Sequence, residues 1–129
     1  MRFILIALLM TFAAPISAQD FQKGYEAARS GDFETALKEW KPLAERGNIV
    51  AQYNLGMMYR NGWGVSRYGN EAVRWYKLSA KQGYADAQFN LGVIYYEGKA
   101  VPQDYIEAAK LYTLAAEQGS VLAQYNLGI

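Results

Sequence analysis

The sequence has no cysteine and no histidine among its 129 residues. Without cysteine, the protein has no disulfide bonds, no thiol nucleophile and no residue that could carry a bacterial lipid anchor. Without histidine, it lacks an imidazole base and, because thiols are also missing, nearly every kind of zinc site. Neither sign of charge is in large excess, since 13 basic residues stand against 12 acidic ones. We therefore expect no cofactor, no metal site and no nucleic-acid partner.

The amino terminus predicts a secretory signal peptide over residues 1–18. Met1-Arg2 gives a positive start, an apolar run follows over residues 3–14, and Pro15 interrupts it before Ala18. A membrane anchor is the competing interpretation, but a membrane span needs about 20 apolar residues, and this run has 12. We expect cleavage after Ala18, a periplasmic or secreted location and no membrane anchor on the mature chain.

The rest of the chain is organised by a hexapeptide that recurs every 36 residues. Ala51-Gln52-Tyr53-Asn54-Leu55-Gly56 returns at residues 87–92, with Phe89 in place of the tyrosine, and again at residues 123–128. A fixed period of this length is typical of a repeat array, in which each unit buries its apolar face against its neighbours. The composition, 52% hydrophobic and 15% aromatic, is that of one globular domain.

The apolar residues recur three or four positions apart, which predicts pairs of helices. The expected helices cover residues 21–30, 33–46, 50–60 and 70–82, and the next unit copies the last two as far as residue 118. Gly47, Gly83 and Gly119 are expected to end the second helix of each unit.

A capping box is predicted at the start of the second helix of the last full unit. Asp104 is followed three residues later by Glu107, which is the spacing of such a box. Tyr68 and Ser66 of the preceding unit match Asp104 and Pro102. We therefore expect the second helix of that unit to start later or more loosely.

These units resemble Sel-1-like repeats, a variety of the tetratricopeptide-type helix–turn–helix solenoid. The shared pattern is Leu-Gly, Tyr, Gly-Xaa-Gly/Ala-Val, Ala, Trp/Leu-Tyr and Ala-Xaa-Gln-Gly, and it covers residues 49–84 and 85–120. Residues 19–48 lack the long loop and are closer to a plain tetratricopeptide helix pair, while residues 121–129 hold a partial repeat helix. The resemblance implies an all-α fold, a right-handed α-α superhelix of antiparallel helix pairs with about three repeats plus a partial fourth.

The helical period divides each first helix into two faces. In the first Sel-1-like unit, Ala51, Leu55, Met58 and Tyr59 share a face that we expect to be core. Gly56 lies beside them and should let the paired helix approach closely, because a side chain there would hold the two backbones apart.

The other face is the candidate binding surface. In the resembled family the first helices line the concave side of the superhelix, where extended peptides are held. On this face each unit offers an aromatic followed by an amide, and an amide can both donate to and accept from a peptide backbone. The resulting peptide-binding prediction comprises Tyr53, Asn54, Met57, Arg60, Asn61, Phe89, Asn90, Val93 and Glu97. In the alternative interpretation, the aromatics fill the seam between units and the amides bond an adjacent helix.

The repeats also differ in charge. Residues 49–84 carry 5 basic and 1 acidic side chain, a net charge of +4, whereas residues 85–120 carry 2 and 5, a net charge of −3. Arg60 in the first of these units and Glu97 in the second therefore predict a groove with a basic and an acidic end. We expect Trp63 to cap its loop against the second helix of the unit, with exposed binding as the alternative.

No catalytic motif is present. None of the serines is followed three residues later by lysine, and Gly62-Trp63-Gly64 lacks the third glycine of a nucleotide loop. We therefore predict a non-enzymatic protein–protein interaction scaffold that binds an extended peptide or protein segment on its concave face. Two alternatives stay open. One is a β-lactam-interacting or β-lactam-hydrolysing cell-wall protein, an activity linked to some members of the resembled family. The other is a structural fragment that self-associates through residues 121–129.

Overall fold

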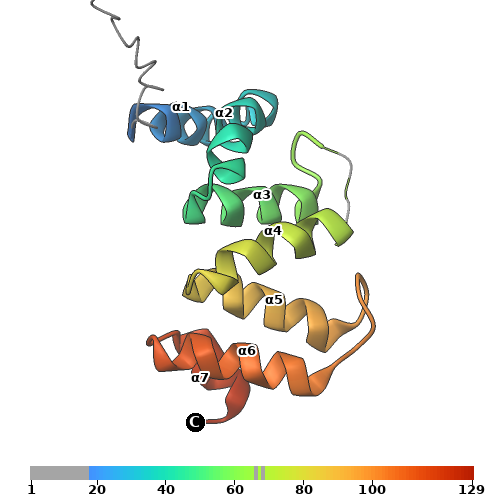
Figure 1. Ribbon diagram of the computed structural model, residues 1–129. Coiled ribbons are helices and arrows are strands. Elements are labelled where there is room, and N and C mark those ends of the chain that lie inside the picture. Colours follow the sequence, from blue (N-terminus) through green and yellow to red (C-terminus); the bar gives the residue numbers. More distant parts are fainter. Residues whose placement is uncertain (1–17, 66, 68) are drawn as a thin grey trace, which may run out of the picture.

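The computed structural model describes residues 18–65, 67 and 69–129. The predicted signal peptide, as far as residue 17, and the positions of Ser66 and Tyr68 lie outside the described residues. All regular structure in the described part is helical (Figure 1). The helices are α1 (Ala18–Arg29), α2 (Phe33–Glu45), α3 (Ile49–Asn61), α4 (Gly69–Lys81), α5 (Ala85–Glu97), α6 (Tyr105–Glu117) and α7 (Val121–Leu127).

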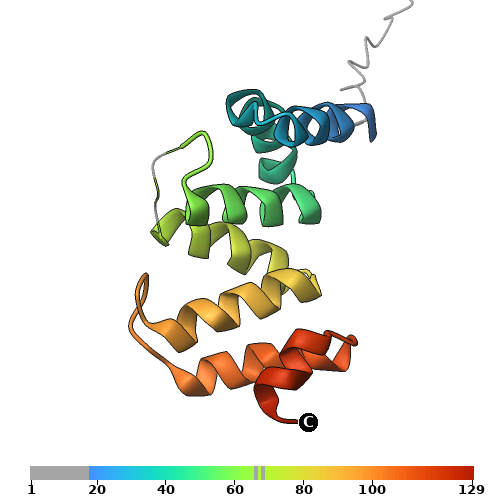
Figure 2. The same ribbon diagram turned by 180° about the vertical axis from the view of Figure 1, so that it is seen from behind.

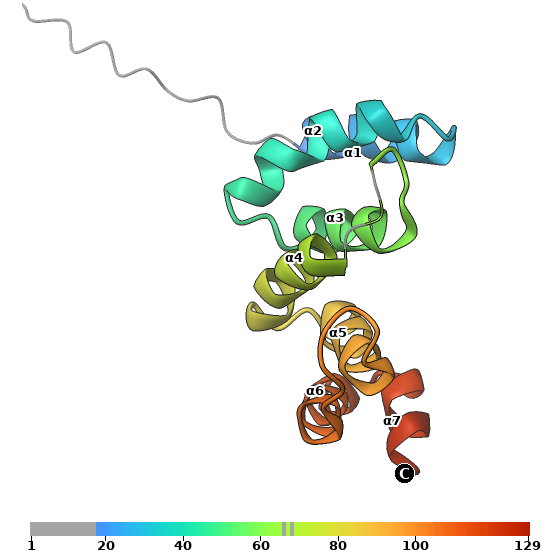
Figure 3. The same ribbon diagram turned by 90° about the vertical axis from the view of Figure 1, so that its right-hand side faces the viewer.

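The helices stack in chain order into an α-solenoid. The extensive contacts all join consecutive helices, from α1 with α2 to α6 with α7. Seen from either side, the long loops of the two Sel-1-like units project from the same edge of the stack (Figures 1 and 2). In the side view, α4 and α6 form one layer and α3, α5 and α7 form the other (Figure 3). The predicted all-α solenoid of helix pairs is confirmed.

The helix starts follow their capping residues. Asp104 accepts a hydrogen bond from the Glu107 N–H at 3.0 Å, as predicted. The capping box is only half formed, however, because the Asp104 N–H donates to the carbonyl of Tyr95 instead. The predicted late start of α4 is wrong, since Gly69 begins α4 at the position equivalent to Tyr105 in α6.

Each helix pair is closed by a glycine on the first helix facing a large aromatic on the second. A Cβ atom added at Gly56 would lie 2.6 Å from Cδ1 of Tyr76, and one added at Gly92 would lie 2.7 Å from Cε1 of Tyr112. Gly24 faces Trp40 in the same way. These contacts confirm the predicted close approach, and they fix the register of the repeats: positions 24, 56 and 92 are equivalent.

The predicted core face is also confirmed. Ala51, Leu55 and Met58 are at most 1% exposed, and Tyr59 packs against them from the edge. Gly47, Gly83 and Gly119 follow the second helices with φ between 90° and 98°, which is the left-handed conformation expected for helix-ending glycine.

A glutamine joins each repeat to the one before it. Gln52 Nε2 donates to the carbonyl of Ala44 at the end of α2, and Gln52 Oε1 accepts from Gln82 Nε2 at 2.9 Å. Gln88 repeats this arrangement one unit later, with the carbonyl of Ala80 and with Gln118 at 2.8 Å. Both Gln52 and Gln88 are 4% exposed, so the second residue of the hexapeptide is a buried connection between repeats.

Candidate functional site: the inner face of the first helices

The aromatic residues of the hexapeptide are packed between helices. The Tyr53 ring lies 5.9 Å from that of Tyr76 and 5.1 Å from that of Tyr84, and the Phe89 ring lies 5.7 Å from that of Tyr112. Burial raises the pKa of the Tyr53 hydroxyl, and the nearby charge of Asp86 adds to the rise. Tyr53 and Phe89 therefore serve the stacking role that the sequence left as the alternative to binding.

The three asparagines of the hexapeptide, in contrast, differ in what they bond. Asn90 accepts from Nη1 of Arg60 at 3.0 Å and donates to the carbonyl of Asp86 at 2.7 Å. Asn126 lies beside the Tyr112 hydroxyl and lowers its pKa, against a larger rise caused by burial. The Asn54 side chain makes no hydrogen bond within the described part of the chain, although the residue is only partly exposed.

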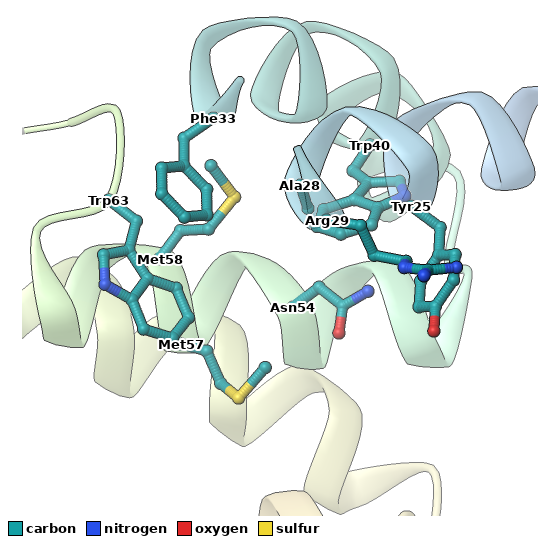
Figure 4. Close-up of a pocket in the computed structure, with 9 residues that line it drawn as sticks. All are labelled: Tyr25, Ala28, Arg29, Phe33, Trp40, Asn54, Met57, Met58 and Trp63. Carbon is teal, nitrogen blue, oxygen red and sulfur yellow. The ribbon is translucent and has the colours of Figure 1, made fainter. Parts of the chain in front are cut away.

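The Asn54 amide lines a mainly apolar pocket between the first helix pair and α3. The cavity has a volume of about 320 Å³, which is large enough to hold a bulky side chain. Its lining comes from Tyr25, Ala28 and Arg29 of α1, Phe33 and Trp40 of α2, Asn54, Met57 and Met58 of α3, and Trp63 of the following loop (Figure 4).

One wall of this pocket, which we call the first pocket, is an aromatic stack. The rings of Trp63 and Phe33 lie 5.4 Å apart and 14° from parallel. Phe33 begins α2 in the preceding repeat, so the prediction that Trp63 caps its loop against the second helix of its own unit is wrong. Trp63 stays 39% exposed, which leaves one face of the stack open to a ligand.

The opposite wall carries the charge. The Arg29 guanidinium lies 6.0 Å from the centroid of the Tyr25 ring and has no carboxylate partner among the described residues. Asn54 lies between this pair and the Trp63–Phe33 stack (Figure 4). The pocket thus combines an apolar surface, an amide free to bond in both directions and an unpaired cation.

The equivalent position one repeat later is filled. Arg60 enters it, bonds Asn90 and lies 4.0 Å from a carboxylate oxygen of Glu97. A cavity of about 70 Å³ remains beside Arg60; its lining includes Arg67 and Lys99 but not Asn90. The Arg60–Glu97 contact joins the basic repeat to the acidic one, so these two groups do not form the separate charged ends that we predicted.

The predicted site residues therefore fall into three groups. Asn54 and Met57 line the first pocket; Arg60, Asn90 and Glu97 form a cluster of their own. Phe89 and Val93 pack against the buried cluster of α6 and α7, and Tyr53 packs against the buried cluster around α4 and α5. Asn61 donates to the carbonyl of Met57 on its own helix at 2.9 Å.

The sequence-based prediction omits Tyr25, Arg29 and Phe33. The register of the glycines could have found Tyr25, because aligning Gly24 with Gly56 places Tyr25 at the position of Met57 and Ala28 at that of Arg60. This comparison shows that the first repeat has a small residue where the next one has an arginine.

Comparison with known proteins identifies the family to which this chain belongs. The Sel1 repeat family model matches residues 49–84 and 85–120, more than half of the chain. The chain belongs to the Sel1-repeat family. Sel1-repeat proteins are generally scaffolds for protein–protein interactions and not enzymes.

Two solved Sel1-repeat structures are similar. A Sel1 repeat protein from Oxalobacter formigenes is 34% identical with a TM-score of 0.80, over 84% of this chain and 44% of that one. The protein c5321, a protective antigen of uropathogenic Escherichia coli strains, is 35% identical with a TM-score of 0.78, over 84% of this chain and 24% of that one. The present chain thus spans less than half of either relative. No curated protein matches it.

Neither a membrane-spanning helix nor a metal-binding cluster is found among the described residues. None of the helices there has the length and apolar character needed to cross a membrane. The same residues contain no group of three or more acidic side chains placed to hold a metal ion.

Proposed function

We propose that this Sel1-repeat protein is an extracytoplasmic, non-enzymatic scaffold that binds an extended protein segment on the inner face of α1 and α3, anchored in the first pocket. The free amide of Asn54 carries the proposal. Water reaches this amide, and it bonds no other residue in the described part of the chain, so a ligand has only water to displace there. A peptide backbone laid across the pocket supplies both a donor and an acceptor to it.

The pocket also specifies the chemistry of the bound segment. A cavity of about 320 Å³ walled by the Trp63–Phe33 stack favours a bulky aromatic or long aliphatic side chain. Arg29, unpaired at the rim, favours a carboxylate on a neighbouring residue of that segment, since Arg–carboxylate hydrogen bonds are strong. The net charge of +4 on residues 49–84 acts in the same direction.

Peptide selection tests the proposal. The full-length chain is expressed in a bacterium, the processed protein is purified, and random displayed peptides are selected on it. We expect apolar residues next to acidic ones to be enriched. Asn54→Ala should weaken binding at least roughly tenfold, which corresponds to about 1.4 kcal/mol.

Asn61→Ala is the matched control, because Asn61 is an amide on the same helix that bonds its own backbone. This variant should bind as the wild type does. Arg29→Gln should reduce affinity and the salt dependence of binding together. Equal binding by wild type and a folded Asn54→Ala variant would reject the pocket as the anchor.

The proposed location has its own test. Amino-terminal sequencing of the processed protein from the extracytoplasmic fraction should begin at residue 19. An unprocessed chain that stays in the cytoplasm would contradict the signal-peptide prediction, and it would leave the peptide-binding test unaffected.

Self-association is a second candidate, favoured by the surface of α7. Four large apolar residues there are between 62% and 82% exposed: Val121, Leu122, Tyr125 and Ile129. Light scattering at increasing concentration should show a dimer that Tyr125→Asp disrupts. A monomer at all concentrations would exclude this candidate.

A further inference from the structure

The inner face carries a series of equivalent sites, one at each junction between repeats. Each consists of a hexapeptide asparagine and the residue four positions after the glycine of the preceding first helix. The pairs are Ala28 with Asn54, Arg60 with Asn90, and Tyr96 with Asn126. The first member is small at the first junction, an arginine at the second and a tyrosine at the third.

At the second junction that space is occupied by the chain itself. The Arg60 side chain is 30% exposed, its Nη1 atom donates to Oδ1 of Asn90 at 3.0 Å, and its Nη2 atom faces Glu97 at 4.0 Å. Arg60 also lies near the Tyr76 hydroxyl, where its charge opposes the rise in pKa that burial causes. An amide oxygen, a carboxylate and a phenol facing one guanidinium make a site for an arginine side chain.

We propose that Arg60 is an internal ligand: its guanidinium fills an arginine-binding site on Asn90 and Glu97 and keeps partner side chains out of the second junction. The consequence for binding rests on the proposed function. A segment anchored in the first pocket contacts α1 and α3 and finds no second anchor one repeat along. The first junction, with Ala28, has a cavity of about 320 Å³ in front of its asparagine. At the second, the Arg60 guanidinium is bonded to the asparagine, and the cavity of about 70 Å³ beside Arg60 does not reach Asn90.

The test removes the Arg60 side chain and offers a small guanidinium compound to the site in its place. Arg60→Ala gives the second junction the residue that the first one has naturally. Ethylguanidinium chloride is titrated into ¹⁵N-labelled protein, and the side-chain amide resonances of Asn90 are followed. We expect saturable shifts in Arg60→Ala, none in the wild type, and at least tenfold weaker binding in Arg60→Ala with Asn90→Ala.

Tetramethylammonium chloride is the ionic control, since it carries the charge without N–H donors. Ethylguanidinium should raise the melting temperature of Arg60→Ala, and tetramethylammonium should not. If folded Arg60→Ala shows no saturable response to ethylguanidinium, the site does not recognise a guanidinium and the proposal is overturned.

A second measurement uses the wild type and therefore tests the proposal even if Arg60→Ala does not fold. In the wild type, the Nη protons of Arg60 should exchange and rotate slowly, compared with those of the exposed Arg46, and Asn90→Ala should abolish the difference. Equal behaviour of Arg60 and Arg46 in the wild type overturns the proposal.

The consequence for binding is read from a peptide selected on the wild type. Its footprint should stay on α1 and α3 in the wild type and extend to α5 in Arg60→Ala; an unchanged footprint rejects the blocking role. If no peptide binds the wild type, the proposed function fails, while the ethylguanidinium titration still decides the role of Arg60.

Discussion

At the residue scale, one hexapeptide divides its side chains between three tasks. The small and aliphatic residues Ala51, Leu55 and Gly56 pack within the repeat, and Gln52 connects it to the repeat before it. The Asn54 side chain bonds no other residue in the described part of the chain. The sequence did not predict that Gln52 connects two repeats. A glutamine in a helical segment can face solvent or a neighbouring carbonyl, and the sequence pattern does not distinguish the two.

The glutamine connection predicts a large effect from a small truncation. Gln52→Ala removes two hydrogen bonds at a buried position: the carbonyl of Ala44 keeps its bond from the Gly47 N–H, and the Gln82 amide keeps its bond to the carbonyl of Gly47. Such a loss costs about 1–3 kcal/mol. We expect urea denaturation to show the free energy of unfolding lowered by that amount.

The control for this prediction is Gln103→Ala. Gln103 also donates to a backbone carbonyl, that of Tyr96 at 2.8 Å, but it is exposed. Its truncation should change stability by less than about 0.5 kcal/mol. Equal effects of the two substitutions would show that the buried connection contributes nothing of its own.

Tyr76 predicts a dependence of stability on alkaline pH. Its hydroxyl is buried without a hydrogen-bond partner in the described part of the chain, and burial raises its pKa well above the usual value. Above a pH of about 10, the unfolded chain loses this proton and the folded chain keeps it. Stability should therefore fall as the pH rises through and beyond 10.

Tyr76→Phe isolates this contribution. It removes the ionisable group and keeps the ring against Gly56, so stability at pH 7 should change little. Thermal melts between pH 8 and 11 should show a shallower decline for the variant. Parallel declines would mean that other tyrosines, such as Tyr53 and Tyr112, account for the alkaline loss.

At the element scale, the helices were predictable because period and glycine placement act locally. The spacing of Ala51, Leu55 and Met58 identifies the core face, and the structure buries all three. We expected α4 to start late because Tyr68 stands in the sequence where α6 has Asp104, yet α4 starts in register with α6.

The candidate site was predictable only in part. Asn54 and Met57 follow from the helical period, because they lie on the face opposite the core. Arg29 and Phe33 belong to a different repeat from Asn54, and only stacking of the two repeats brings them together. Residue pairs of this kind, such as Arg60 with Asn90, depend on how far each repeat turns relative to the last.

Helix α6 offers a test of what local capping contributes where it is present. Asp104→Ala removes the side chain that accepts from the Glu107 N–H, and losing such a cap costs about 0.5–2 kcal/mol. Asp104→Asn keeps an acceptor and should lose only a few tenths. Denaturation curves for the pair check the expectation, and equal losses would show that charge, not the cap, is what matters.

At the scale of the whole molecule, stability is distributed along one dimension. The extensive contacts join only consecutive helices, so each repeat depends on its immediate neighbours. The buried clusters divide in the same way, into one around α2 and α3, one around α4 and α5, and one around α6 and α7. Disturbing one junction should therefore loosen the chain on one side of it more than on the other.

Gln88→Ala tests this at the junction between the two Sel1 repeats. Gln88 bonds the carbonyl of Ala80 and the amide of Gln118, so its loss weakens the attachment of α5 and α6 to α4. In hydrogen exchange under native conditions, amides of α5, α6 and α7 should exchange faster than in the wild type, while those of α2 should keep their rates. The asymmetry arises because α7 has no second helix packed on it in the described part of the chain, whereas α3 is held by both α2 and α4. If exchange rises equally from α1 to α7, the molecule unfolds as a single unit, and each junction then supports the whole chain instead of its neighbours alone.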